Sequence, residues 1–341
     1  MPDETEVIEP LSVIDVLDRL EENVQRGEIP GMQVFPTGFR ALDRRIGGGL
    51  RQGDLLLLGG SEGAGKTTFA FQLARNIAAS KQCLVLYFCY EHSEDDLLLR
   101  LLSIESVEQT VTGELQGLRA ADLRPRLLQA SRSRGTFTRE LSRDPLGRRA
   151  LQRLEDYGEY FKVMKASASL TDTNSIQAVV DDCRRHTDKD VMVVVDYLQK
   201  MPLRVEGVTE DERIGRITEN LKELALSRAV PVVAIVAADK HGLEARRLRS
   251  YHLRGSSSLL YEADIILIMN EKSRIVSRQA VDLTEFKVAT MSNWVVFSIE
   301  KNRSGRDLVD FQLRKLFSYG LFDPSGDSVP EPLFDERVYT E

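Results

Sequence analysis

A glycine-rich segment after an apolar run is the feature that most narrows the folds open to this chain. The segment GGSEGAGKTTF (59–69) follows the run LLLL and precedes the helix-like FAFQLARNIAA. Its spacing, Gly60-x-x-x-x-Gly65-Lys66-Thr67, fits the phosphate-binding loop (P-loop), and a strand before it and a helix after it are the context this motif requires. Such a loop turns backbone N–H groups toward phosphate oxygens, and the following helix adds the partial positive charge of its N-terminus. The segment therefore predicts a nucleoside triphosphate site, with ATP as the expected ligand.

Side chains of the loop have distinct expected roles. Lys66 is expected to reach the β- and γ-phosphates, and the hydroxyl of Thr67 is expected to bind Mg²⁺. A glycine turn with a chance lysine is the alternative, and the flanking strand and helix argue against it. The predicted nucleotide-binding residues of the loop are Gly60, Gly63, Gly65, Lys66, Thr67 and Thr68.

Composition excludes several classes of protein. The 341 residues are 42% hydrophobic and 29% charged, as in globular proteins. The beginning, MPDETEVIEP, is acidic and unlike a signal peptide. The longest apolar runs are about half of the ~20 residues that a membrane helix needs. The three cysteines and four histidines show no metal-ligand spacing. We expect a cytoplasmic protein without a membrane segment, and the net charge of −7 still permits a local basic channel.

Short apolar runs alternate with amphipathic helical segments from about residue 53 onward. The runs include CLVLYFCYE, VMVVVDYLQ, PVVAIVAAD, ADIILIMN and WVVFSIEKN. Continuous Val/Ile/Leu runs are typical of strands buried on both faces, and alternation with helices is typical of a parallel, doubly wound sheet. The predicted fold class is α/β, with a mainly parallel twisted sheet flanked by helices.

The chain divides into three expected parts. Residues 1–34 hold a helix (11–26) and a connector rich in glycine and proline, residues 35–323 form the ATPase domain, and residues 324–341 form a loose acidic tail. The helix has apolar residues at helical spacing. Its apolar stripe fits either its own domain or a neighbouring subunit, since amphipathicity does not distinguish the two.

An arginine-rich segment interrupts the alternation. Residues 104–170 show no good strand and are predicted to be a helical insertion. Ten arginines but only three acidic residues lie between 119 and 153. Most charge runs are solvated helix faces. The alternative is a contact for phosphate or for the acidic surface of a protein partner.

Two carboxylates follow predicted strands. Asp196 ends VMVVVD, where a carboxylate can bind Mg²⁺ through water, as P-loop ATPases require. Glu91 follows CLVLYFCY, where it can orient and deprotonate the attacking water. A helix N-terminal acid at Glu91 would look the same in sequence. Near the C-terminus, Lys301 and Arg303 follow the strand WVVFSIE, either as surface cations or as groups that reach a neighbouring subunit's phosphates.

Together, these features resemble the C-terminal domain of DnaB-type replicative helicases over residues 35–323. The matching segments occur in the family's order: FPTGFRALDRRIGGGLRQGDLLLLGG, the P-loop, LYFCYEHSEDDLLLRLL, VVVDYLQKM, LKELALSRAVPVVAI, LRGSSSLLYEADIILIM and SIEKNRSG. The resemblance implies a RecA-like ATPase that forms hexameric rings and translocates along single-stranded DNA. It also implies that helix 11–26 docks on the adjacent subunit. The residue roles it implies are phosphate and Mg²⁺ binding by Lys66, Thr67 and Asp196, base catalysis by Glu91, and action in trans by Lys301 and Arg303.

The sequence departs from the family at three points. Only about 35 residues precede the matching region, so we expect an accessory relative without the N-terminal primase-binding domain. The family's Ser-Gln pair after the strand PVVAI, whose Gln senses the γ-phosphate, is replaced by Val236 and Ala237. Alanine cannot hydrogen-bond phosphate, so that role is lost or passes to Asp239 or Lys240. Gly255 stands where the family's loop has an acid.

A basic tract at 239–258 is the candidate DNA contact. Lysine and arginine that follow a phosphate backbone give binding that is independent of sequence and sensitive to salt. A solvated loop is the alternative, because no aromatic stacking platform is evident. The candidate residues are Arg246, Arg247, Arg249 and Arg254.

The sequence is compatible with two functions. One is a DnaB-like helicase or translocase that hydrolyses ATP on single-stranded DNA as a ring. The other is an ATP-dependent switch or scaffold with the RecA fold, which oligomerises on ATP and binds protein partners without unwinding DNA.

Overall fold

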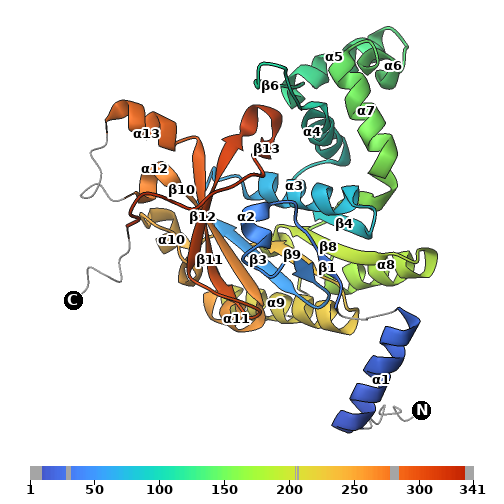
Figure 1. Ribbon diagram of the computed structural model, residues 1–341, viewed down its shortest axis with the longest axis vertical. Helices are drawn as coiled ribbons and strands as arrows, with labels where there is room; N and C mark the ends of the chain where they lie inside the picture. Colours follow the sequence, from blue (N-terminus) through green and yellow to red (C-terminus); the bar gives the residue numbers. More distant parts are fainter. Residues whose placement is uncertain (1–9, 28–31, 204, 206, 277–283, 335–341) are drawn as a thin grey trace.

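A nine-stranded twisted sheet organises the chain (Figure 1). The structure, a computed structural model, describes residues 10–27, 32–203, 205, 207–276 and 284–334. The strand order is β13-β12-β11-β10-β3-β9-β8-β4-β7. Six of these strands are parallel: β3 (Leu55–Gly60), β4 (Cys83–Cys89), β7 (Phe161–Lys165), β8 (Asp190–Asp196), β9 (Val232–Ile235) and β10 (Ile265–Glu271). Three continue the sheet antiparallel: β11 (Trp294–Asn302), β12 (Val309–Leu316) and β13 (Leu321–Phe322).

Helices cover both faces of the sheet. On one face lie α3 (Lys66–Ala79) and α4 (Glu94–Ser106), and on the other lie α8 (Thr173–His186), α9 (Glu210–Ser227) and α11 (Ser256–Glu262) (Figure 1). Side chains of β3 alternate between the two layers, because successive residues of a strand point to opposite faces. Leu56 and Leu58 join the core beneath α3, whereas Leu55 and Leu57 join the core beneath α9. The predicted α/β class with a mainly parallel sheet is confirmed.

Short elements connect these layers. Before the P-loop, β1 (Val34–Phe35) pairs with β2 (Leu50–Arg51) around α2 (Arg40–Asp43). Other short elements outside the arginine-rich insertion are η2 (Leu198–Lys200), α10 (Lys240–Glu244), η3 (Ser250–His252), α12 (Lys272–Ile275), α13 (Glu285–Met291) and η4 (Phe317–Tyr319). Among the described residues, no helix combines the length and apolar character needed to cross a bilayer.

The arginine-rich insertion forms a helical lobe with a small core of its own. It contains β5 (Glu108–Gln109), β6 (Leu115–Gln116), α5 (Ala120–Arg132), α6 (Phe137–Leu141), α7 (Pro145–Tyr157) and η1 (Gly158–Tyr160). Leu118, Leu123 and Leu141 pack there against α4. The expectation of no strand in 104–170 was wrong, since β7 is the edge strand of the main sheet. Its sequence, FKVMK, is only partly buried, so it lacks the continuous apolar pattern of the central strands.

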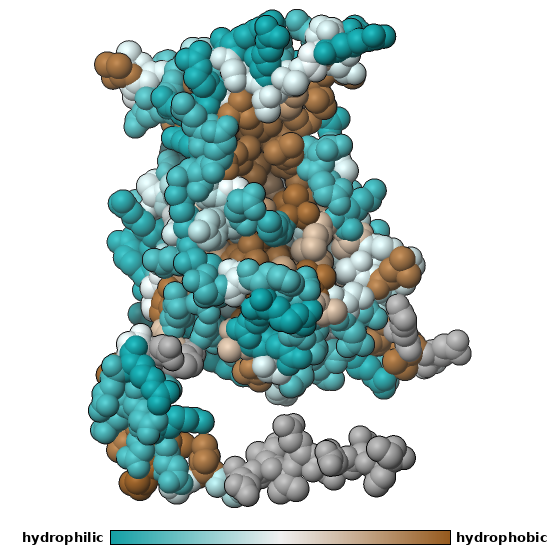
Figure 2. Space-filling view, turned by 90° about the vertical axis from the view of Figure 1, so that its right-hand side faces the viewer, coloured by the Kyte–Doolittle hydropathy of each residue, from teal (hydrophilic) through white to brown (hydrophobic). Residues whose placement is uncertain are grey.

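The N-terminal helix is present as α1 (Val13–Arg26). Ser12 and Asp15 form a reciprocal capping box at its start, and Gly27 ends it in the left-handed conformation. None of its residues is buried, and Figure 2 shows it standing away from the main body. The side chain of Val13 is 83% exposed. The apolar stripe of α1 is therefore not covered by the described part of its own chain.

The described part of the tail, 324–334, packs on the sheet rather than hanging loose. Asp327 bridges Gln312 of β12, and Leu333 bridges Val276. Residues 335–341 of the expected tail, and residues 1–9 of the expected N-terminal segment, lie outside the described residues.

Candidate active site

The P-loop joins the carboxyl end of β3 to the N-terminus of α3. Gly65 caps α3 with a φ of +93°, in the left-handed region that favours glycine. A Cβ there would lie 2.4 Å from Cζ of Phe317, so close packing also requires glycine. Lys66 Nζ donates to the carbonyl oxygens of Gly60, over 2.9 Å, and Ser61, over 3.1 Å. Burial lowers the pKa of Lys66, against the opposing effect of nearby carboxylates, of which Asp196 is the strongest.

Asp196 reaches the P-loop from β8. Its side chain is 1% exposed and accepts hydrogen bonds from Thr67 Oγ1 over 3.3 Å and from the Tyr87 hydroxyl over 2.8 Å. Burial raises the pKa of Asp196 to about 6. A hydroxyl and a carboxylate side by side are the hard oxygen donors that Mg²⁺ prefers, so the residues present fit this ion.

Glu91 belongs to the same edge of the sheet. Cys89 pairs with Asp196 in the register of β4 and β8, and the Tyr90 N–H donates to the Asp196 carbonyl over 2.8 Å. Glu91 is exposed and lines a cleft of about 670 Å³ together with the P-loop. This P-loop cleft is lined by Gly60, Glu62, Lys66, Thr67, Glu91, Asp196, Tyr197, Gln199, Lys200, Glu210, Ile235, Ala237, Ala238, Leu243 and Arg254.

The side chain of Gln199, a residue not predicted from the sequence, contacts Ala237, which stands where the family has its glutamine. Its Oε1 accepts a hydrogen bond from the Ala237 N–H over 3.0 Å. Its Nε2 is buried and makes no hydrogen bond with the described residues. Asp239 and Lys240, the two residues expected to replace the family's glutamine, do not line the cleft. Asp239 instead accepts a hydrogen bond from the Gly242 N–H, over 2.6 Å, at the start of α10, and Lys240 is exposed. The signal available in the sequence was a glutamine just after a buried strand, VVVDYLQ.

Gly255 is required by the turn into α11. Its φ is +81°, and a Cβ there would lie 2.6 Å from Cγ2 of Ile214. The acid found in the family's loop therefore does not fit at this position without moving α9.

A second hollow lies on the other side of the P-loop helix. Its volume is about 400 Å³, and Phe317, 39% exposed, contributes an aromatic ring next to Gly65. Arg100 donates to the His92 ring over 3.0 Å, so His92 accepts there. Burial and the Arg100 charge lower the pKa of His92. The residues of this side hollow include Thr68, Phe71, Arg100, Ser103, Arg119, Phe317 and Tyr319.

Lys301 and Arg303 do not lie with the other predicted catalytic residues. The register pairs Asn302 with Ile265, which in turn pairs with Leu56 near the start of β3. The P-loop follows the opposite end of β3, about 13 Å farther along the strand at ~3.3 Å per residue. The structure therefore brings Lys66, Thr67, Asp196 and Glu91 together at one edge and leaves both C-terminal cations at the other.

Two arginines of the predicted DNA-binding tract are buried in ion pairs. Arg247 is 4% exposed and contacts both carboxylate oxygens of Asp310 at 2.9 Å. Arg249 is likewise buried and donates to Glu300 over 2.7 Å. A guanidinium held in a buried ion pair cannot follow a DNA backbone, so these two residues stabilise the fold instead.

The other two arginines of the tract are partly accessible. Arg246 lies over the ring of Phe334, 4.3 Å from its centroid, and donates to the Val276 carbonyl over 2.8 Å. Arg254 pairs with Glu210 over 3.0 Å and lines the P-loop cleft. Of the four candidate arginines, only Arg254 therefore lines the P-loop cleft.

Comparisons with known proteins identify the family of this chain. The model of the DnaB-like helicase C terminal domain matches residues 34–318. The replicative DNA helicase DnaB of Geobacillus stearothermophilus is 27% identical over 276 residues, which cover 76% of this chain and 52% of that protein. DnaB of Pasteurella multocida is 29% identical over 259 residues, which cover 74% of this chain and 50% of that protein. The chain spans about half the length of these curated relatives.

Two solved structures share the fold. One is an ATPase domain with a TM-score of 0.68 at 21% identity, and the match covers 92% of this chain and 99% of that chain. The other is a DnaB-like replicative helicase, from a structure that describes its interactions with primase. It has a TM-score of 0.66 at 20% identity, and the match covers 92% of this chain and 67% of that chain. The predicted RecA-like P-loop ATPase fold is confirmed.

Proposed function

We propose that this protein, which belongs to the DnaB-like helicase C-terminal domain family, hydrolyses ATP as a hexameric ring that moves along single-stranded DNA. The observation that carries the proposal is the division of the catalytic groups between opposite edges of one sheet. Within one subunit, the P-loop and its carboxylates lie at one edge of the sheet and the two cations lie at the other. A complete site therefore forms only where the P-loop of one subunit faces the cations of the next subunit in a ring.

Residues of the P-loop cleft would have different roles in ATP hydrolysis. The backbone of Gly60, Gly63 and Gly65 would cradle the phosphates, and Lys66 would leave its loop carbonyls for the β- and γ-phosphates. Thr67 and Asp196 would hold Mg²⁺, which neutralises charge on these phosphates. Glu91 would orient and deprotonate the attacking water, as its place in the cleft allows.

The side hollow suits the base and sugar of the nucleotide. It begins at Thr68, directly after the P-loop, and Phe317 and Tyr319 offer rings on which a base can stack.

The three cysteines in this protein are free thiols, as expected for the cytoplasm, where we place it.

Ring formation would use α1 and two cations at the end of β11: Lys301 within the strand and Arg303 in the turn after it. The uncovered apolar stripe of α1 would dock on the adjacent subunit. Arg303 and Lys301 would contact the γ-phosphate bound by the next subunit, where an arginine supplied in trans stabilises the charge of the transition state.

The arginine-rich insertion is proposed to bind an acidic protein partner. Several of its arginines are occupied within the chain, including Arg126 with Asp144 and Arg143 with Glu140. Arg132, Arg134 and Arg139 are exposed and have no ion pair with the described residues. An uncompensated positive surface at the far end of the lobe favours a partner of opposite charge.

Steady-state ATP hydrolysis with and without single-stranded DNA, for wild type and Arg303→Ala, tests the proposal. We expect DNA to stimulate the wild type, and we expect Arg303→Ala to lose about 10³-fold in rate, as for other trans-acting arginines. Arg306→Ala, in the same exposed turn, is the matched control and should keep the wild-type rate. Hydrolysis that is indifferent to both DNA and Arg303 would instead favour the switch or scaffold.

A further inference from the structure

Arg303 is held on one side by the end of α11 and is open to solvent on the other. Its Nη2 donates to the Tyr261 carbonyl, and its Nη1 donates to Asp264 Oδ1 over 3.3 Å. Lys301 Nζ donates to the carbonyls of Leu260, over 2.5 Å, and of Tyr261, over 3.1 Å. The Arg303 side chain remains 49% exposed. Both cations therefore gather at the carboxyl end of α11, where the helix dipole favours positive charge.

Asp264 is itself fixed by the sheet and by α9. Its Oδ2 accepts hydrogen bonds from the Leu55 N–H over 2.7 Å and from Lys222 Nζ over 2.6 Å. Lys222 Nζ also donates to the Gly53 carbonyl over 2.8 Å. The Arg303 N–H donates to the backbone carbonyl of Asp264 over 2.9 Å. These contacts fix the orientation of the Asp264 carboxylate, so that its Oδ1 points toward the guanidinium of Arg303.

We propose that Asp264 is the positioning residue of Arg303. It holds the guanidinium at the sheet edge, with its free side aimed outward at the phosphate site of the next subunit. The inference rests on the proposed function, in which Arg303 acts across the subunit interface. An arginine side chain that is already ordered loses less rotamer freedom when it meets the phosphate, and an oriented donor stabilises transition-state charge without rearrangement.

The same support begins beside the P-loop cleft of the same chain. Arg254, on the wall of the P-loop cleft, directly precedes the glycine that caps α11. The far end of this seven-residue helix supplies the Tyr261 carbonyl to Arg303. The position of Arg303 is thus set by elements that also shape the cleft of its own subunit.

Asp264→Asn separates positioning from folding. An asparagine keeps a carbonyl oxygen for the Leu55 N–H and Lys222, but it turns an amide donor toward Arg303. We expect its ATP hydrolysis to fall by about 100-fold, as when a reacting group is misplaced by ~1 Å. ATP affinity should be unchanged, because the P-loop of each variant subunit is intact. Asp181→Asn, in a partly exposed pair with Arg228, is the matched control and should keep the wild-type rate.

Mixed rings give the deciding measurement. Lys66→Ala subunits cannot use ATP but carry an intact Arg303 and Asp264, so mixing them with Asp264→Asn subunits should restore hydrolysis at mixed interfaces. A slow Asp264→Asn variant that Lys66→Ala does not rescue would overturn the inference, and so would a variant with the wild-type rate. Arg303→Ala mixed with Lys66→Ala tests the proposed function separately. No recovery in that control means that Arg303 does not act in trans, whatever Asp264 does.

Discussion

The Tyr87 hydroxyl donates a hydrogen bond to Asp196 Oδ2 over 2.8 Å, across 109 residues of sequence. Thr67 donates to the other oxygen, Oδ1, over 3.3 Å. These donors favour the ionised carboxylate, yet burial outweighs them and raises the pKa of Asp196 to about 6. The ionised form that Mg²⁺ needs is therefore maintained at neutral pH against a cost of desolvation.

Because of this cost, the stability of the wild type should depend on pH in a way that the stability of Asp196→Asn does not. The pKa of Asp196 is raised from 3.8 to about 6 on folding, so its contribution to stability is present at low pH and is lost as pH rises through 6. Between pH 8 and pH 5 the wild type should gain about 1 kcal/mol of unfolding free energy relative to Asp196→Asn. Urea unfolding of both proteins at the two pH values measures this, and a constant difference would contradict it.

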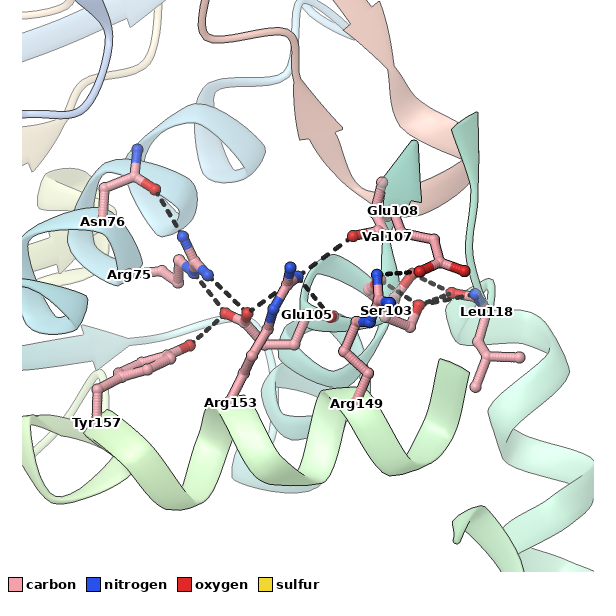
Figure 3. Close-up of polar contacts among 11 residues, drawn as sticks. Arg75, Asn76, Ser103, Glu105, Val107, Glu108, Leu118, Arg149, Arg153 and Tyr157 are labelled. Carbon is pink, nitrogen blue, oxygen red and sulfur yellow. Dashed lines mark hydrogen bonds and ion pairs between the residues drawn. The ribbon is translucent and has the colours of Figure 1, made fainter. Parts of the chain in front are cut away.

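Removal of the Glu105 carboxylate should destabilise the protein strongly. Glu105 is fully buried between α3, α4 and α7, where it forms an ion pair with Arg75 and accepts from the Tyr157 hydroxyl over 2.5 Å (Figure 3). Arg153 Nη1 lies 3.9 Å from Glu105 Oε2. Glu105→Ala leaves Arg75 without its partner at the joint between the P-loop helix and the insertion, which should cost about 3 kcal/mol.

An exposed ion pair provides the control for that change. Glu159 pairs with Lys162 over 3.3 Å, but its side chain is 91% exposed. Glu159→Ala should change the unfolding free energy by less than about 0.5 kcal/mol. Equal urea midpoints for Glu105→Ala and Glu159→Ala would show that burial of Glu105 contributes nothing to stability.

The site residues that sequence could predict are those whose chemistry is contained in a short motif. The P-loop needs only its own spacing and the strand and helix beside it. Asp196 ends one strand that is buried on both faces, and Glu91 follows another. Parallel strands deliver such residues to one edge regardless of the details of packing. The sheet core was predictable for the same reason.

Features that depend on distant partners escaped prediction. Charge pattern could not tell that Arg247 and Arg249 would find Asp310 and Glu300, more than fifty residues later, and lie buried. Strands near the edge of the sheet, such as β12, carry alternating polar residues and give no continuous apolar run. Gln199 became notable only when the register of β8 and β9 brought it to Ala237.

Arg249→Met and Arg254→Met should differ in their effect on stability. Arg249 and Glu300 are both buried, so Arg249→Met leaves an unpaired buried carboxylate and should cost about 3 kcal/mol. Arg254 pairs with Glu210 at the surface, with 41% and 55% of the side chains exposed, so its replacement should cost less than about 1 kcal/mol. Urea unfolding distinguishes them, and similar small losses would mean that the basic tract is a solvated loop after all.

Leu17→Glu on α1 should abolish ring assembly and leave the stability of the subunit unchanged. Leu17 is 48% exposed, and no residue of α1 is buried against the described part of its own chain. A carboxylate in this stripe would have to be desolvated against the adjacent subunit, which disfavours docking. Light scattering after size-exclusion chromatography should therefore report a hexamer for wild type and monomers for Leu17→Glu, with equal urea midpoints for the two subunits. Arg19→Gln, on the opposite face of α1, should still assemble. A hexamer formed by Leu17→Glu would show that α1 does not hold the ring, whereas a lowered urea midpoint would show that its apolar stripe packs on its own subunit.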